Sequence, residues 1–314
     1  MIKVFIDGKA GTTGLKIYDR LTERDDLELL TLPEELRKDT AARKEMLNKA
    51  DIAFLCLPDA AAKEAVSLIE NDKTVVIDTS TAHRTNPDWA YGFPELSEEF
   101  YEKVKTSRRI AVPGCHASGF IALVYPLVAK GAISADALLS CFSLTGYSGG
   151  GKQMIADYES EDRNSELSSP RQYGVAQSHK HIPEMTAVTG INNAPVFSPI
   201  VADYFSGMEV TVPLHKSQLC DGFGIESLRE IYKEAYCDSL VSYTEEMDST
   251  GFVASNTLSG FDNMQISVSG NDDRILLIAR YDNLGKGASG AAVECMNIAL
   301  GIDKTTSLLI KEVN

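Results

Sequence analysis

The stretch IAVPGCHASGFIALVYP, residues 110–126, joins a short apolar run to a helical pattern through a tight turn. The run Ile110–Val112 predicts a strand, and the pair Pro113-Gly114 predicts the turn. After Cys115, apolar residues recur at roughly helical spacing. We therefore expect a strand, a turn and a helix in succession, with Cys115 in the first turn of the helix.

The position of Cys115 favours a reactive thiolate. The first turn of a helix has free backbone N–H groups and the positive end of the helix dipole, and both stabilise an anion. Such a position lowers the pKa of a cysteine, and the same N–H groups can stabilise an oxyanion. A free cysteine is more often a buried structural residue. The pattern alone leaves both roles open.

The composition is that of a soluble globular protein with one or two domains. The chain has 314 residues, of which 44% are hydrophobic and 24% are charged. Its net charge of -15 argues against nucleic acid or an anionic membrane as a partner. An anionic small molecule is compatible with this charge, because a basic pocket can lie within an acidic surface.

We expect a cytoplasmic protein with no signal peptide, no membrane-spanning helix and no disulfide framework. The first residues, MIKVFIDG, have the pattern of a strand and a turn, and no run of about 18 apolar residues occurs. The cysteines, at positions 56, 115, 141, 220, 237 and 295, form neither a CxxC pair nor a cluster. This pattern is typical of a reducing compartment and does not predict a zinc site.

A glycine-rich turn, DGKAGTTG at residues 7–14, follows a predicted strand at residues 2–6 and precedes a helical pattern. Dinucleotide-binding domains use such glycines to bring backbone N–H groups close to a pyrophosphate. The spacing is GxxGxxG and not GxGxxG, so a turn without a ligand is the alternative. The candidate cofactor-binding residues are Gly8, Gly11, Thr12, Thr13 and Gly14.

The sequence favours NADP over NAD. In NAD-binding sites an acidic residue near the end of the second strand binds the ribose 2′-hydroxyl. The second predicted strand, residues 27–32, ends without an acidic residue, and Arg37 and Lys38 follow it. The alternative is that these two residues lie on the solvated face of a helix.

The next segments predict a doubly wound α/β domain of the Rossmann type. Residues 51–57 and 74–77 are apolar runs typical of buried parallel strands, with a helical pattern between them. Ligands bind at the carboxyl ends of such strands. Ser80 and Arg84 follow the second run, so they are candidates for cofactor and substrate binding, respectively. A surface arginine that caps Asp88 is the alternative for Arg84.

The loop GYSGGGKQ, residues 146–153, follows the first predicted strand of a second domain. It matches GxxxxGK, but Gln153 stands where a P-loop needs Ser or Thr for magnesium. A loop that packs against a bound substrate is the better interpretation, and a P-loop phosphotransferase is an alternative. The candidate substrate-binding residues are Ser148, Gly149 and Lys152.

The motif HKHIPE, residues 179–184, follows a polar segment at 157–174 that we expect to be a long loop or lid. Pro183 suits the start of a helix. His179, His181 and Glu184 are conceivable metal ligands, but catalytic zinc needs three well-placed ligands and a second shell. A general acid–base histidine oriented by a carboxylate is more economical, so we expect no metal.

The remaining strands predict an α+β domain with a mixed or antiparallel sheet. Residues 208–214 alternate in polarity and end at His215, and residues 263–269 and 274–281 flank a hairpin-type turn.

The last motif is DNLGKGASG, residues 282–290, before a C-terminal helical pattern. Because such a loop can hold an anion, Asn283 and Gly287 are candidate cofactor-binding residues. A plain helix start capped by Ser289 is the alternative.

Together these motifs resemble the N-acetyl-gamma-glutamyl-phosphate reductase family, in particular its shorter class. The resemblance covers essentially the whole chain. It is carried by IDGKAGTTG (6–14), PGCHASG (113–119), GYSGGGK (146–152), HKHIPE (179–184) and YDNLGKGASGAA (281–292). His116 stands where the longer class has an aromatic residue, which indicates the short class.

The resemblance implies a two-domain reductase like aspartate-semialdehyde dehydrogenase. Residues 1–114 with 286–314 would form the NADP-binding domain, and 115–285 the catalytic and dimerisation domain of a homo-oligomer, a dimer or a tetramer. In the implied step of arginine biosynthesis, the Cys115 thiolate attacks N-acetyl-gamma-glutamyl phosphate and phosphate leaves. Hydride from NADPH then releases N-acetylglutamate semialdehyde.

The resemblance also suggests roles for individual residues. We expect His181 to be the acid–base group, oriented by Glu184, with His179 and His215 as rivals. The candidate substrate-binding residues are Arg84, Lys152, Lys180 and His215, of which the first three would hold phosphate or carboxylate.

Two other activities stay open. A reductase of N-acetyl-aminoadipyl or aspartyl phosphate would use the same chemistry, because one methylene changes binding by only ~1–3 kcal/mol. A nucleotide-binding regulator would have the fold without turnover.

Overall fold

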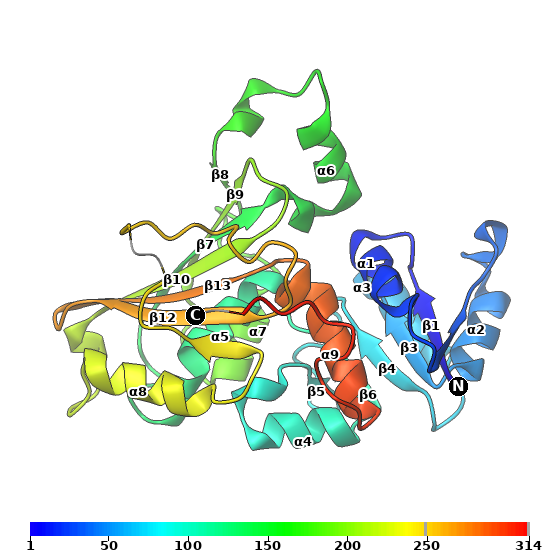
Figure 1. Ribbon diagram of the computed structural model, residues 1–314, viewed down its shortest axis with the longest axis horizontal. Helices are drawn as coiled ribbons and strands as arrows, with labels where there is room; N and C mark the ends of the chain where they lie inside the picture. The colour runs from blue at the N-terminus through cyan, green and yellow to red at the C-terminus, as the bar shows by residue number, and fades with distance from the viewer. Residues whose placement is uncertain (248–249, 313–314) are drawn as a thin grey trace. The chain divides into compact units, whose positions relative to one another are not determined.

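The computed structural model describes residues 1–247 and 250–312 (Figure 1). These residues form two compact units. The first unit comprises Met1–Pro94, Glu98–Gly114 and Ala288–Leu308; the second comprises Glu95–Ser97, Cys115–Gly287 and the described residues from Leu309 onward. The expected domain ranges, 1–114 with 286–314 and 115–285, remain a prediction, and residues 313–314 lie outside the described residues.

The first unit is built on a parallel sheet with strand order β2-β1-β3-β4-β6-β5. Its strands are β1 (Ile2–Asp7), β2 (Leu27–Leu30), β3 (Ile52–Leu55), β4 (Val75–Asp78), β5 (Ala90–Tyr91) and β6 (Arg109–Ala111). Parallel neighbours need crossover connections, which here are mostly helices. The Rossmann-type α/β fold predicted from the sequence is confirmed.

Both faces of this sheet are buried. In β3, Ile52 and Phe54 belong to one hydrophobic cluster, and Ala53 and Leu55 belong to another. Since successive side chains of a strand point to opposite faces, the apolar run builds two cores. The first includes side chains of α1 (Thr12–Leu21), α4 (Glu98–Thr106) and α9 (Gly290–Ala299), and the second those of α2 (Thr40–Lys49) and α3 (Asp59–Ser67).

The second unit contains a mixed sheet with strand order β11-β12-β13-β10-β7-β9-β8. The pairs β7–β9 and β11–β12 are parallel and the other pairs are antiparallel, so the predicted mixed sheet is confirmed. The strands are β7 (Ser140–Gly146), β8 (Arg171–Gln172), β9 (Val196–Ala202), β10 (Met208–His215), β11 (Val241–Tyr243), β12 (Met264–Gly270) and β13 (Arg274–Tyr281).

The helix α5 (Cys115–Ala129) packs against β10, β13, α7 (Ile182–Thr189) and α8 (Ile225–Ala235). Pro126 has no N–H, so it cannot donate to the carbonyl of Ala122 four residues earlier. The hydroxyl of Tyr236 donates to that carbonyl at 2.7 Å. This bond satisfies a buried acceptor that the proline leaves open. Neither α5 nor any other described helix has the length and apolar character needed to span a membrane.

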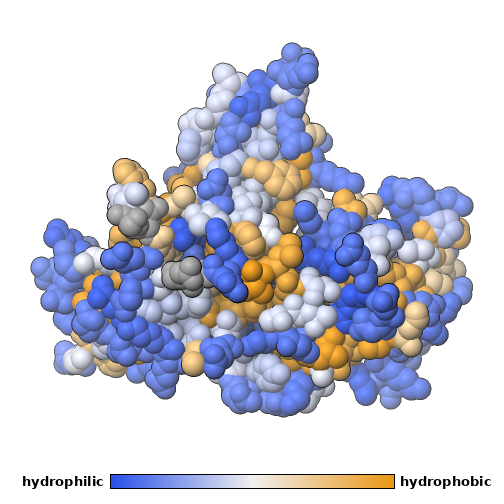
Figure 2. Space-filling view, in the orientation of Figure 1, coloured by the Kyte–Doolittle hydropathy of each residue, from blue (hydrophilic) through white to orange (hydrophobic). Residues whose placement is uncertain are grey.

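Residues 147–172 form an extension of the second unit, here called the arm, which projects beyond β7 and β9 (Figure 1). It contains the 3₁₀ helix Tyr147–Gly150, α6 (Gly151–Glu159), the 3₁₀ helix Ser165–Ser168 and β8. The expected long loop therefore has secondary structure, and a small hydrophobic cluster around Tyr158, Leu167 and Val201. The tip of the arm is mostly hydrophilic (Figure 2).

Candidate active site

Cys115 is the first residue of α5 and is half-buried. The hydroxyl of Tyr281, at the end of β13, donates to the carbonyl of Cys115 at 2.5 Å and accepts from the N–H of Gly119 at 3.0 Å. Tyr281 thereby fixes the first turn of the helix to the sheet. A Cβ atom on Gly287 would lie 3.1 Å from the Cβ of Cys115. The absence of a side chain at Gly287 thus lets its loop lie against the cysteine.

Three histidine rings form a cluster next to this turn. The ring centroids of His116 and His181 are 5.6 Å apart, as are those of His116 and His179, and those of His179 and His181 are 4.7 Å apart. The backbone N–H of His181 donates to Nδ1 of His179 at 3.2 Å. His181 directly precedes α7, and Glu184 is buried in the first turn of that helix. The motif HKHIPE and the PGCHASG motif therefore meet in space.

His116 lies at the centre of the cluster. Its Nδ1 is 2.7 Å from Oγ of Ser143 on β7, and its Nε2 is 2.5 Å from the hydroxyl of Tyr173. Burial lowers the pKa of His116 to about 3, and the charges of His179 and Lys180 lower it further in the same direction. The ring is neutral at neutral pH. Sequence reasoning used His116 only as a class marker and missed Ser143 and Tyr173; the histidine directly after the cysteine was the available signal.

The glycine-rich segments at 146–149 and 282–287 also meet, at the sheet edge where β7 and β13 end. Nδ2 of Asn283 donates to Oγ of Ser148 at 2.9 Å, and Oδ1 of Asn283 accepts from the N–H of Gly207 at 2.9 Å. The side chain of Asn283 is 3.4 Å from the position of a Cβ atom on Gly149. The side chains of Ser148 and Asn283 are thus neighbours, in the same part of the unit as Gly287, where an added Cβ would crowd Cys115.

The segment after Asn283 is a π-helix, Gly285–Ser289, before α9. Its Lys286 forms a buried ion pair with Glu95. A π-helical turn is rare and is often found at functional sites.

In the first unit, the turn between β1 and α1 fits a dinucleotide. Gly8 has φ +87°, and a Cβ atom there would lie 2.2 Å from the carbonyl oxygen of Cys56. The turn therefore requires glycine at this position. Oγ1 of Thr12, in the first turn of α1, is buried without a hydrogen-bond partner among residues 1–247 and 250–312. An acceptor for this hydroxyl, together with the free N–H groups of the helix start, matches a pyrophosphate.

A cavity of about 610 Å³ adjoins this turn. Its lining includes Gly8, Gly11 and the β2 residues Leu29 and Leu30. Basic side chains also line it, namely Lys9, Arg37, Lys38 and Arg43. Oδ2 of Asp7 accepts from Nε of Arg43 at 3.0 Å, which anchors one of these cations beside the turn.

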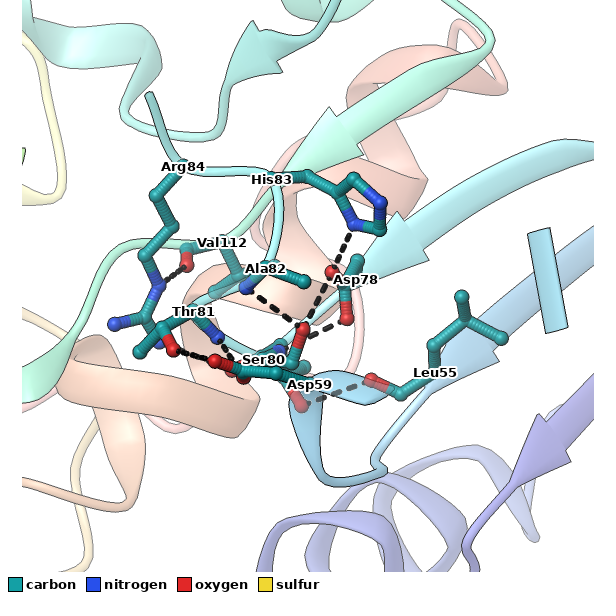
Figure 3. A network of polar contacts seen from close by, with 10 residues as sticks. Leu55, Asp59, Asp78, Ser80, Thr81, Ala82, His83, Arg84 and Val112 are labelled. Carbon is teal, nitrogen blue, oxygen red and sulfur yellow. Dashed lines mark hydrogen bonds and ion pairs between the residues drawn. The ribbon is translucent and has the colours of Figure 1, made fainter. Parts of the chain in front are cut away.

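The loop after β4 is held by a buried network (Figure 3). Asp78 accepts from the N–H of Ser80 at 2.9 Å and from its hydroxyl at 2.7 Å, and it lies 2.6 Å from Nδ1 of His83. The ring of His83 stacks on that of Trp89, with 4.0 Å between the ring centroids. Arg84 donates to the carbonyls of Val112 at 2.9 Å and Thr79 at 3.0 Å. The network fixes Ser80 and Arg84 at the carboxyl edge of the sheet.

Three predicted substrate residues are exposed. Lys180 lies between the two clustered histidines, and Lys152 lies in the first turn of α6. His215 is at the far end of β10 from Met208, whose neighbour on β13 is Tyr281. Seven residues along a strand span about 23 Å. The structure therefore does not bring His215 to the cluster.

Within the described ranges, no group of three or more His, Cys, Asp or Glu side chains is arranged to hold a metal ion.

Comparisons with known proteins cover both units. Residues 3–104 match the semialdehyde dehydrogenase NAD binding domain, and residues 115–283 match the semialdehyde dehydrogenase dimerisation domain. Among solved structures, aspartate semialdehyde dehydrogenase II from Vibrio cholerae has a TM-score of 0.73 at 16% identity, over 96% of this chain and 98% of that chain. Aspartate semialdehyde dehydrogenase with NADP from Candida albicans has a TM-score of 0.68 at 15% identity, over 95% and 98%. These structures share the fold.

Curated relatives are closer in sequence. The N-acetyl-gamma-glutamyl-phosphate reductase of Rhizobium etli is 45% identical over 305 residues, which cover 95% of this chain and 98% of the relative. That of Brucella ovis is 45% identical over 306 residues, covering 95% and 99%. The resemblance inferred from the motifs is thereby confirmed. The chain belongs to the N-acetyl-gamma-glutamyl-phosphate reductases, within the semialdehyde dehydrogenase family.

Proposed function

We propose that this chain reduces N-acetyl-gamma-glutamyl phosphate to N-acetylglutamate semialdehyde and phosphate, through a thioester on Cys115, as a step of arginine biosynthesis. The observation that carries the proposal is the placement of Cys115 at the start of α5, beside a histidine cluster. The name of the relatives, which align over nearly the whole chain, supplies the substrate.

The position of Cys115 suits the acyl-transfer step. The thiolate adds to the acyl carbon, the carbonyl oxygen becomes an oxyanion, and phosphate leaves as the carbonyl re-forms. The backbone N–H groups and the positive end of the helix dipole at the start of α5 would stabilise both the thiolate and the oxyanion. The bonds between Tyr281 and the first turn of α5 keep these N–H groups in place during the reaction.

His181 is our candidate for the proton transfers. It takes the proton of the thiol and later protonates the oxygen of the aldehyde. Glu184 is proposed to orient it, and His179, which accepts a hydrogen bond from the His181 backbone, is the rival. His215 is left out of this proposal, because it lies at the far end of β10.

The anionic groups of the substrate need cations. Lys180 adjoins the cluster in sequence, and Arg84 and Lys152 are the other candidates for phosphate and carboxylate. Ser148 and Gly149 would pack against the bound substrate. The KM for phosphate in the reverse reaction measures this role, and unchanged values for Lys180→Ala, Lys152→Ala and Arg84→Ala would refute it.

NADPH supplies the hydride when it is bound. Gly8, Gly11, Thr12, Thr13 and Gly14 would hold its pyrophosphate, with Ser80, Asn283 and Gly287 as further candidates. Arg37 and Lys38 line the cavity and would hold the 2′-phosphate, which favours NADP over NAD. The ratio of kcat/KM for NADPH and NADH tests this preference.

We also propose a cytoplasmic homo-oligomer that forms through the second unit. One face of its sheet exposes apolar side chains, including Phe142 on β7, Val196 on β9 and Leu276 on β13. The register of these strands places the three on the same face. Exposed apolar patches are typical of protein interfaces. A monomeric mass in solution would refute the oligomer.

The reverse reaction tests the main proposal. Wild-type protein is incubated with N-acetylglutamate semialdehyde, NADP and phosphate, and Cys115→Ser is measured in parallel. We expect phosphate-dependent formation of NADPH that falls at least about 1,000-fold in the variant, since serine is a far weaker nucleophile. Turnover only with the aminoadipate or aspartate semialdehyde would keep the mechanism and change the substrate. No turnover with any of the three would favour a nucleotide-binding regulator.

A further inference from the structure

We propose that Tyr173 is a further catalytic residue of this reductase, and that His116 and Ser143 are positioning residues that direct its hydroxyl toward the acyl group on Cys115. This inference rests on the proposed function, because it assigns Tyr173 to the acyl transfer at that cysteine.

The first observation is a continuous chain of hydrogen bonds. Ser143, His116 and Tyr173 are linked through Nδ1 and Nε2 of the imidazole, at 2.7 Å and 2.5 Å. A neutral imidazole has one N–H and one acceptor nitrogen. When the Ser143 hydroxyl donates to Nδ1, the N–H on Nε2 donates to the oxygen of Tyr173. The proton of the Tyr173 hydroxyl is then free to be donated to a different acceptor.

The second observation is that His116 and Tyr173 both keep the protonation state that the role requires. Burial holds His116 neutral, since it lowers the pKa of the ring to about 3. Burial also raises the pKa of Tyr173, and the charge of Cys115 adds to this effect. The hydroxyl therefore stays protonated, and its bond to His116 holds it at the residue that directly follows Cys115.

The third observation is that the backbone and ring of Tyr173 are fixed. The residue follows β8, which pairs with β9, and its N–H donates to the carbonyl of Pro199 at 3.0 Å. The ring packs on the hydrophobic cluster of the arm. The ring of His116, which bonds to Tyr173, is itself held by its neighbours. Its centroid lies 5.5 Å from that of Phe197, and the rings of His179 and His181 also flank it. A donor held in this way needs little reorganisation during the reaction.

The role follows from the charge that develops in the acyl step. The sulfur–carbon bond forms, the carbonyl oxygen gains negative charge, and the carbon–oxygen bond to phosphate then breaks. We assign Tyr173 as a hydrogen-bond donor to that carbonyl oxygen. The tyrosine keeps its proton throughout, so the step requires no further reactant.

The test compares Tyr173→Phe with Tyr158→Phe in the reverse assay. Tyr158 is a matched control, because its hydroxyl accepts from Arg171 inside the arm and contributes to the same cluster. We expect Tyr173→Phe to lower kcat at least about tenfold, as does loss of a donor to an oxyanion, with KM values and melting temperature near those of the control. A kcat within twofold of Tyr158→Phe would overturn the inference. Wild-type protein without turnover would instead refute the proposed function, and the inference with it.

The positioning role of His116 has its own test. Glutamine at 116 offers an amide near the place of Nε2, whereas leucine offers no polar atom. We therefore expect His116→Gln to retain more of the wild-type kcat than His116→Leu. Adding Tyr173→Phe to His116→Leu should lower kcat by less than twofold, because the two residues act as one unit. Multiplicative losses in the double variant, or equal rates for the two His116 variants, would contradict this role.

Discussion

The glycine-rich turn of the first unit and the histidine cluster of the second are built in opposite ways. The turn comes from consecutive residues, 7–14, and its geometry depends on backbone atoms, as the 2.2 Å approach at Gly8 demonstrates. The cluster comes from four separate segments, around Cys115, Ser143, Tyr173 and 179–184, and it depends on side chains. A binding site for phosphate can therefore be local in sequence, whereas a site for acid–base chemistry requires the fold to assemble it.

This difference predicts that side-chain changes in the cluster have the largest effect on turnover. We expect His181→Asn to lower kcat about 100-fold or more, which is the usual contribution of a general acid–base group. Steady-state kinetics of the reverse reaction measures it. The rival His215→Asn should change kcat less than threefold, since that residue is exposed at the other end of β10. If His181→Asn stayed within threefold of the wild type, the acid–base assignment would fall.

The cluster should also make the protein sensitive to acid. Because the pKa of folded His116 is about 3 and that of an unfolded histidine is about 6.5, the unfolded state binds more protons in this window. Stability contributed by the neutral ring is therefore lost as the pH falls from about 6.5 toward 3. Between pH 7 and pH 5, linkage gives a loss of roughly 2 kcal/mol in the free energy of unfolding.

Urea denaturation at the two pH values measures this loss. We expect the difference between pH 7 and pH 5 to be smaller by this amount in His116→Gln. The exposed His215→Gln is the control and should keep the wild-type difference. Identical pH dependence in wild type and His116→Gln would show that His116 is not the acid-sensitive group.

We expect the glycine-rich turn of the first unit to be sensitive to steric crowding of its backbone and not to the chemistry of its side chains. We expect Gly8→Ala to raise the KM for NADPH about tenfold, since overpacking of this size costs about 1–3 kcal/mol. Gly131→Ala is the matched control, because Gly131 also has a positive φ, +73°, but no atom lies within 4 Å of the added Cβ. Equal KM values for NADPH in the two variants would show that the contact between residue 8 and Cys56 does not limit the cofactor site.

The same contrast explains what could be predicted from the sequence. The strand β1, the glycine-rich turn and the helix α1 are consecutive in the chain. The periodicity of their apolar residues and the glycines of the turn were therefore sufficient to predict them. The strands β5, β8 and β11 have two or three residues, too few to establish a period. The helix α6 begins at a run of glycines, which predicted a loop there.

The site was predicted in the same uneven way. Cys115 and the HKHIPE histidines stand in recognisable motifs, so they could be singled out. Tyr173 ends a polar segment, and nothing in its neighbourhood indicates that it lies against His116, 57 residues earlier. That contact depends on the pairing of β8 with β9 and of β9 with β7. Such register is a property of the assembled sheet and leaves no local signal.

The helix α9 has a consequence for how this chain folds as it leaves the ribosome. Its residues Ala291, Val293 and Met296 complete a core whose other members, such as Ile17 and Ile110, are made far earlier. At 5–20 residues per second, synthesis of the second unit separates these parts by roughly 10–35 s. During that interval this face of the sheet is covered by α1 and α4 but not by α9. The core on this face is therefore completed only after nearly all of the second unit has been synthesised.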